Sequence, residues 1–139
     1  MKKNYIYLSI VFLISISVAN AQNNDFLNGG GDQLWSNALN WSLGVVPNTT
    51  NTAQVRLPLP IESLVDTDIS IKKLQNTFAT SVDVPIGGSE TLTIDAGSGG
   101  AFGIENVSND DVSLIFNGNL AINNSAGVNA FTFFRSQNG

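Results

Sequence analysis

The chain has 139 residues, with six basic and eleven acidic side chains and neither cysteine nor histidine. The two missing residue types exclude disulfides, a cysteine nucleophile, a Ser-His-Asp triad and a zinc site built on imidazole or thiolate. The shortage of Lys and Arg excludes a basic surface of the kind that binds nucleic acid or anionic membranes.

The first residues predict export. Two lysines precede an apolar stretch over 5–18, and the small-residue motif Ala19-Asn20-Ala21 follows it. This order predicts a cleavable signal peptide over 1–21 and a mature chain that begins at Gln22. The apolar run is shorter than the ~20 residues of a spanning helix, so we expect a secreted or cell-surface protein with no membrane span after cleavage. The mature chain then keeps four basic and eleven acidic residues, a net charge of −7.

Asparagine and glycine divide the mature chain into short segments. Both residues tolerate left-handed backbone conformations and are common in turns. Their clusters lie at 28–31, 48–51, 97–100, 117–119 and 123–124. The glycine-rich runs lack the lysine and the following helix of a phosphate-binding loop, so they are interpreted as turns.

Segments with an apolar residue at every second position lie between these turns, which is the pattern of half-buried strands. They are 55–57, 69–71 leading into Leu74, 82–86, 92–94, 102–104, 112–116, 120–122 and 131–133. No window of the mature chain keeps a helical period over three turns. The sequence therefore predicts an all-β fold.

The strand spacing favours a solenoid over the alternative, a β-sandwich or jelly roll. Successive strand centres are roughly seven to thirteen residues apart, which suits short strands of one coil. We therefore expect a right-handed parallel β-helix over 53–139, with asparagines stacked at its corners. The last apolar strand has no polar closing repeat after it, so we also expect the coils to be truncated at the C-terminus, with the chain being the first part of a longer repeat protein.

The alternation also predicts which side chains point into the coil. All are aliphatic or aromatic and lie at alternate strand positions. They are Val55, Leu57, Ile69, Ile71, Leu74, Val84, Ile86, Leu92, Ile94, Phe102, Ile104, Leu114, Phe116, Leu120, Ile122, Phe131 and Phe133.

The segment before the coils carries a resemblance. It contains Leu34-Trp35-Ser36, then Asn40-Trp41-Ser42, then Val46-Pro47-Asn48, and ends in a short strand, Ala53-Gln54-Val55. A stretch typical of a stacked strand follows further on, Leu92-Thr93-Ile94-Asp95-Ala96-Gly97. This order resembles the N-terminal region of secreted bacterial β-solenoid repeat proteins, both autotransporter-like adhesins and exported proteins of Bacteroidetes-type bacteria. The resemblance implies the architecture of such proteins, and it is not specific for a function.

Two interpretations of the tryptophans follow. The first coil of a solenoid has an open apolar end that must be covered, so Trp35 and Trp41 could close it as part of a cap segment over 22–52. Alternatively, the same two rings could form a stacking platform for carbohydrate. The first interpretation predicts buried rings near Val55, and the second predicts exposed, coplanar ones.

Asp66 and Asp68 lie on one side of an extended segment and form half of a candidate calcium site, with a charged turn as the alternative. No pair of carboxylates is identifiable as a glycosidase pair. Lys72 and Lys73 are interpreted as solvated surface charges rather than as a lyase base. The sequence identifies no catalytic residue, and Ca²⁺ is the only cofactor it suggests.

We therefore expect a non-catalytic, adhesin-like structural segment of a secreted or cell-surface β-solenoid, with extracellular glycans or host-cell surface components as partners. The alternative is the N-terminal part of an exported polysaccharide-degrading enzyme, a β-helix lyase or a glycoside hydrolase.

Overall fold

The computed structural model describes residues 22–50, 52–95, 103–107, 113–123 and 134–136. These residues form a β-solenoid of about three turns whose named strands all pair in parallel. The elements in chain order are β1 (Gln22–Asp25), a 3-10 helix (Ala38–Asn40), β2 (Thr52–Leu57), β3 (Ile69–Ile71), β4 (Leu74–Asn76), β5 (Val82–Pro85), β6 (Thr91–Asp95), β7 (Ile104–Asn106), β8 (Leu114–Asn117), β9 (Asn119–Asn123) and β10 (Phe134–Ser136). The expected parallel β-solenoid is confirmed, and the sandwich alternative is not.

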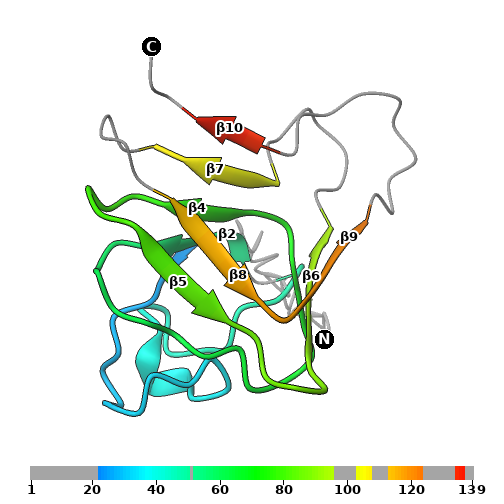
Figure 1. Cartoon of the computed structure of the whole chain (residues 1–139). Coiled ribbons are helices and arrows are strands. Elements are labelled where there is room, and N and C mark those ends of the chain that lie inside the picture. Colours follow the sequence, from blue (N-terminus) through cyan, green and yellow to red (C-terminus); the bar gives the residue numbers. More distant parts are fainter. Residues whose placement is uncertain (1–21, 51, 96–102, 108–112, 124–133, 137–139) are drawn as a thin grey trace, which may run out of the picture.

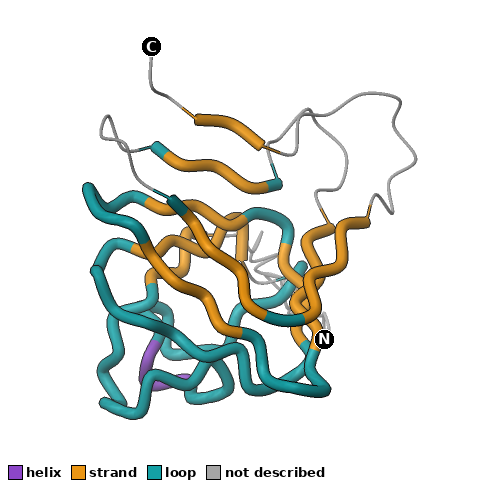
Figure 2. The backbone as a smooth tube through the Cα atoms, viewed as in Figure 1, coloured by secondary structure: helices purple, strands orange, loops and turns teal. Residues whose placement is uncertain are grey.

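The strands form three ladders, one for each side of the coil. The first ladder runs β1-β2-β4-β7-β10, the second β3-β6-β9 and the third β5-β8 (Figure 1). Leu74, Ile104 and Phe134 are register partners on successive turns, so these two coils have a period of 30 residues. At the end of the solenoid away from β10, the chain forms loops and the short helix (Figure 2).

Most of the predicted inward set is buried. Nine of its members lie in β2 to β6 or directly after β5, and Ile104 lies in β7; together they are Val55, Leu57, Ile69, Ile71, Leu74, Val84, Ile86, Leu92, Ile94 and Ile104. Leu114, Phe116 and Leu120 are partly buried and pack against this core. The alternation therefore identified the inner face of each of these strands.

Ile122 is a correction to that set, because 44% of it is exposed. Ile122 is the register partner of the fully buried Ile94, so it lies at the predicted position in its ladder, but its side chain is not buried as predicted. Periodicity specifies the face of a strand, whereas burial also needs a neighbour on each side. Phe102, Phe131 and Phe133 lie outside the described residues.

Two strand boundaries also differ from the sequence prediction. The segment 69–71 does not continue into Leu74, because the chain turns a corner there and Leu74 begins β4 in another ladder. The strand β1 was not predicted at all, since Gln22-Asn23-Asn24-Asp25 has no apolar alternation. It forms because β2 offers it a parallel partner, with Asn24 opposite Val55.

An asparagine ladder is present at one corner, as expected. Asn76 is fully buried and is the register partner of Asn106 on the next turn. Its side chain accepts a hydrogen bond from the amide of Phe78 (3.0 Å) and donates one to the carbonyl of Thr80 (3.2 Å), so it holds the turn that leaves β4. No helix within the described residues is long and apolar enough to cross a membrane.

Candidate functional site

Three aromatic rings close the first coil. Phe26, Trp35 and Trp41 are all buried, and Trp41 contacts each of the other two rings edge to face at a centroid distance of 5.1 Å. The indole N–H of Trp35 donates to Ser63 Oγ (2.9 Å), and that of Trp41 donates to the carbonyl of Trp35 (2.8 Å). Each indole thus has both an apolar contact and a partner for its one polar atom, which is how a tryptophan is buried at little cost.

This geometry is the one expected of a cap. Trp35 is 0% and Trp41 3% exposed, and their rings are almost perpendicular at 88°. A carbohydrate platform needs an open ring face, and neither indole offers one. The two tryptophans are therefore assigned to the cap, and a carbohydrate site has to be sought elsewhere on the molecule.

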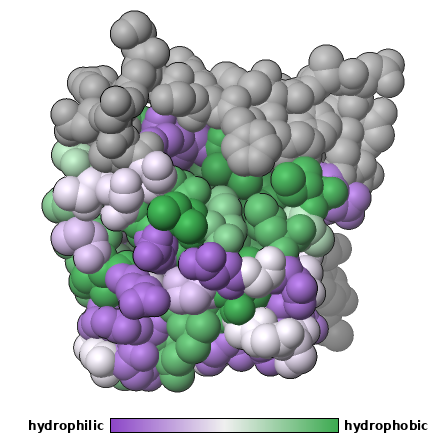
Figure 3. Space-filling model, in the orientation of Figure 1, coloured by the Kyte–Doolittle hydropathy of each residue, from purple (hydrophilic) through white to green (hydrophobic). Residues whose placement is uncertain are grey.

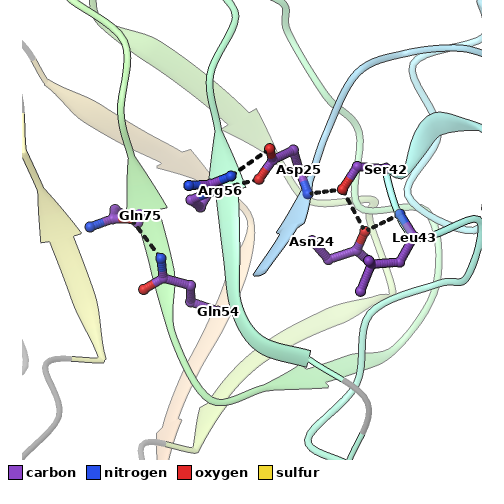
Figure 4. A network of polar contacts seen from close by, with 7 residues as sticks. All are labelled: Asn24, Asp25, Ser42, Leu43, Gln54, Arg56 and Gln75. Carbon is purple, nitrogen blue, oxygen red and sulfur yellow. Dashed lines mark hydrogen bonds and ion pairs between the residues drawn. The ribbon is translucent and has the colours of Figure 1, made fainter. Parts of the chain in front are cut away.

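Polar side chains attach the cap to the first strands (Figure 4). The buried amide of Asn24 accepts from the backbone of Leu43 (3.1 Å) and donates to the carbonyl of Val45 (2.9 Å). Beside it, Arg56 reaches both carboxylate oxygens of Asp25, at 2.5 and 2.7 Å. These hydrogen bonds raise the pKa of the guanidinium of Arg56.

A second polar cluster shapes the loop before the short helix. Asn40 is fully buried, accepts from the amide of Gly30 (2.8 Å) and donates to the carbonyl of Leu34 (2.8 Å) and to Asp32 Oδ1 (2.6 Å). Hydrogen bonds from Asn40 and from Asn37 hold the pKa of Asp32 below its ordinary range. A side chain on Gly30 would collide with Asn40, since its Cβ would lie 2.8 Å from Asn40 Oδ1.

The two candidate calcium ligands have different protein partners in the structure. Asp66 accepts from both the amide (2.9 Å) and the hydroxyl (2.5 Å) of Ser36 in the cap. Asp68 accepts from the amide of Thr91 on the next turn (2.8 Å). Within the described residues no three potential metal ligands of the His, Cys, Asp or Glu type come together. The two carboxylates connect the cap to the coils and neighbouring coils to each other.

Asp68 nevertheless lines a groove on the outside of the second ladder. One hollow of about 470 Å³ lies between the cap segment 46–49 and the segment 67–70, and a second of about 340 Å³ continues from 68–70 to β6. The two share Asp68, Ile69 and Ser70, so they form one groove that crosses the strands from the cap to the second coil. Ligand-binding pockets have volumes of this order.

The groove gathers hydroxyl groups that the protein does not use itself. In the described part of the chain, the side chains of Thr49, Thr67, Ser70 and Thr93 have no hydrogen-bond partner. Some hydroxyls elsewhere on the molecule are engaged, as at Ser63, which accepts from Trp35. Each unused hydroxyl offers one donor and two acceptor positions. Among the lining residues only Asp68 carries a charge.

A third hollow, of about 360 Å³, lies beside the β5–β8 face. Its lining combines two carboxylates, Glu62 and Asp83, with apolar residues that include the half-exposed Ile115. Across this face of the molecule apolar and polar residues are interspersed (Figure 3). The one hydroxyl that lines this hollow, Ser81 Oγ, already accepts from the amide of Ser113 (2.9 Å).

A polar network on the outer face of the first ladder was missed in the sequence. Lys73 pairs with Glu105 of the next turn at 2.5 Å, and Gln75 links Glu105 (2.9 Å) to Gln54 of the previous turn (3.0 Å). Lys73 was expected to be a solvated charge, but the structure places it in this pair with 17% of its side chain exposed. Only the stacking of coils brings residues about 20 to 30 positions apart into such contact.

Comparisons with known proteins do not show a family for this chain. The chain matches no protein-family model, no curated protein and no solved structure. The fold, the cap and the groove are therefore the features that bear on the function of this chain.

Proposed function

We propose that this chain is a non-catalytic, adhesin-like structural segment of a secreted or cell-surface β-solenoid. The observation that carries the proposal is the aromatic cap, in which Phe26, Trp35 and Trp41 cover the apolar end of the first coil. A terminal cap is what a solenoid needs to keep its core from water. The residues thus serve to start and stabilise a stack of coils.

The sequence supports export and a bacterial repeat-protein origin. Residues 1–21 have the order of a cleavable signal peptide. The Trp, Asn-Trp and Val-Pro elements that resemble secreted bacterial solenoids all lie in the cap or beside the groove. N-terminal sequencing of the exported protein tests this part of the proposal, with Gln22 expected as the first residue.

The alternative function, polysaccharide degradation, finds less support. A glycosidase places two carboxylates across its cleft, whereas Asp68 is the single charged residue that lines the groove. Two carboxylates, Glu62 and Asp83, line the separate hollow beside β5, whose one hydroxyl already accepts from a backbone amide. Lys73 is paired with Glu105 on the first ladder, not on the second ladder where the groove lies. We therefore assign the groove no chemical step.

An activity assay on the mature chain separates the two functions. Neutral and acidic polysaccharides are incubated with the protein, and new reducing ends and new carbon–carbon double bonds are measured. We expect neither product above a heat-denatured control. Reproducible turnover that is lost when Asp68 is replaced by Asn would overturn the non-catalytic assignment.

A further inference from the structure

We propose that the groove from segment 46–49 across β3 to β6 binds a neutral oligosaccharide chain. This inference deepens the adhesive part of the proposed function and rests on it. It moves the candidate carbohydrate site away from the two tryptophans, which are buried in the cap, to a surface that the sequence did not indicate.

Hydrogen-bonding capacity is the first argument. Thr49, Thr67, Ser70 and Thr93 line one continuous groove, and their side chains have no hydrogen-bond partner within the described residues. A hydroxyl can donate and accept at the same time, which matches the hydroxyls of a sugar. In the open groove these hydroxyls face water, and a polyhydroxylated ligand can replace that water with several hydrogen bonds at once.

The repeat of the coil is the second argument. Ser70 and Thr93 are register partners in β3 and β6, and adjacent strands are about 4.8 Å apart. The groove crosses the strands, so a chain lying in it meets equivalent positions at that interval. One pyranose unit of an extended glycan has a comparable length, and successive sugars would thus face successive coils.

Charge and shape select the class of ligand. No lysine or arginine lines the groove, and the one charged lining residue is Asp68, whose Oδ1 already accepts from Thr91. A carboxylated or sulfated glycan would meet this negative charge without a compensating cation. Val46, which is partly exposed, adds an apolar contact at the cap end that suits the C–H face of a sugar ring. These features favour a neutral chain.

The first experiment titrates the mature chain with defined hexasaccharides. Cellohexaose, xylohexaose and maltohexaose are the neutral probes, and hexagalacturonate is the acidic one. We expect saturable calorimetric binding of at least one neutral probe, with a Kd of about 1 mM or tighter. The amide NMR signals of Ser70 and Thr93 should shift. Absence of binding by every neutral probe at about 10 mM, or shifts confined to another face, overturns the proposal.

Substitutions then locate the site. The double change Ser70→Ala and Thr93→Val removes two hydroxyls and should weaken binding about tenfold, as expected for two lost hydrogen bonds. Thr80→Val is the matched control, because Thr80 is exposed and lies outside the groove. It should bind as the parent does. Equal affinity of the double variant and the parent, with both proteins folded by their melting curves, rejects the groove as the site.

A charge variant distinguishes the ligand class. In Asp68→Asn the amide oxygen can still accept from Thr91 while the negative charge is gone. Neutral glycan binding should persist, and hexagalacturonate binding should become stronger than in the parent. Tight binding of hexagalacturonate by the parent protein contradicts the neutral assignment. Glycan binding that survives all groove substitutions leaves the adhesive function in place and rejects only the groove.

Discussion

The coils and the cap are stabilised in different ways. The coils place an aliphatic residue at the same register position on successive turns, as at Val55, Leu74 and Ile104. In the cap, burial depends on contacts that occur once, such as the perpendicular pair Trp35 and Trp41 and the single hydrogen bond of each indole. If a methyl group is removed in the coils, the equivalent residues on the neighbouring turns keep their contacts. A missing ring in the cap has no equivalent elsewhere to take over its contacts.

The same contrast holds for polar groups. The coils use side-chain ladders along their outer face, for example from Gln54 through Gln75 to Glu105. The cap instead buries Asn24 and Asn40 and satisfies them with backbone partners of its own loops. Buried polar groups with fixed partners specify one loop arrangement, because any other arrangement leaves them unpaired. The cap should thus be more sensitive to substitution than the coils.

The largest expected effect is at the tryptophans. Trp35→Ala or Trp41→Ala should lower the free energy of unfolding by about 3–5 kcal/mol, the range for a large buried aromatic. Leu39→Ala is the control within the same cap, because Leu39 is 72% exposed and should change stability little. The free energy of unfolding of all three variants is measured by chemical denaturation. Unchanged midpoints for both tryptophan variants would remove the cap interpretation.

A smaller effect is expected at the buried amide of the cap. Asn40→Ala removes the partners of the Gly30 amide and the Leu34 carbonyl, which should cost about 2 kcal/mol. Asn23→Ala is the comparison, since Asn23 is exposed on β1. Equal stability of the two variants in denaturant would show that the polar contacts of the cap do not stabilise it.

The coils allow a matched test within one ladder. Ile94 and Ile122 are register partners on successive turns, but only Ile94 is buried. Ile94→Val should cost about 1 kcal/mol, and Ile122→Val should cost much less. A similar loss at both positions would mean that Ile122 is covered in solution, and the correction made to the inward set would itself be wrong.

The smallest expected effect concerns pH. Asn40, Asn37 and the Leu34 amide hold the pKa of Asp32 below its ordinary range. The unfolded chain therefore takes up a proton at this carboxyl at higher pH than the folded chain. The stabilisation is present above the ordinary aspartate range and is lost as pH falls toward the lowered pKa. The melting temperatures of the parent and of Asp32→Asn should become equal as the pH falls. A difference in melting temperature that does not change with pH would argue against the stabilising hydrogen bonds of Asp32.

The candidate site was less predictable than the core. Asp68 was identified in the sequence as a candidate calcium ligand, which stays a prediction, and in the structure it accepts from the Thr91 amide of the next turn. Ser70 and Thr93 were seen only as the outward members of alternating strands. Their meeting in one groove depends on which strands are neighbours, and alternation within a strand carries no information about that.

The sequence by itself determined the all-β class, the turns and the inner face of the strands from β2 to β7, because a strand exposes alternate residues to alternate sides. It also predicts a signal peptide, which stays a prediction. Tertiary structure alone decided that Gln22–Asp25 is a strand, that Lys73 is paired and that Ile122 is half-exposed. The physical reason is common to all three, since each depends on what lies one coil away, about 30 residues distant in the chain.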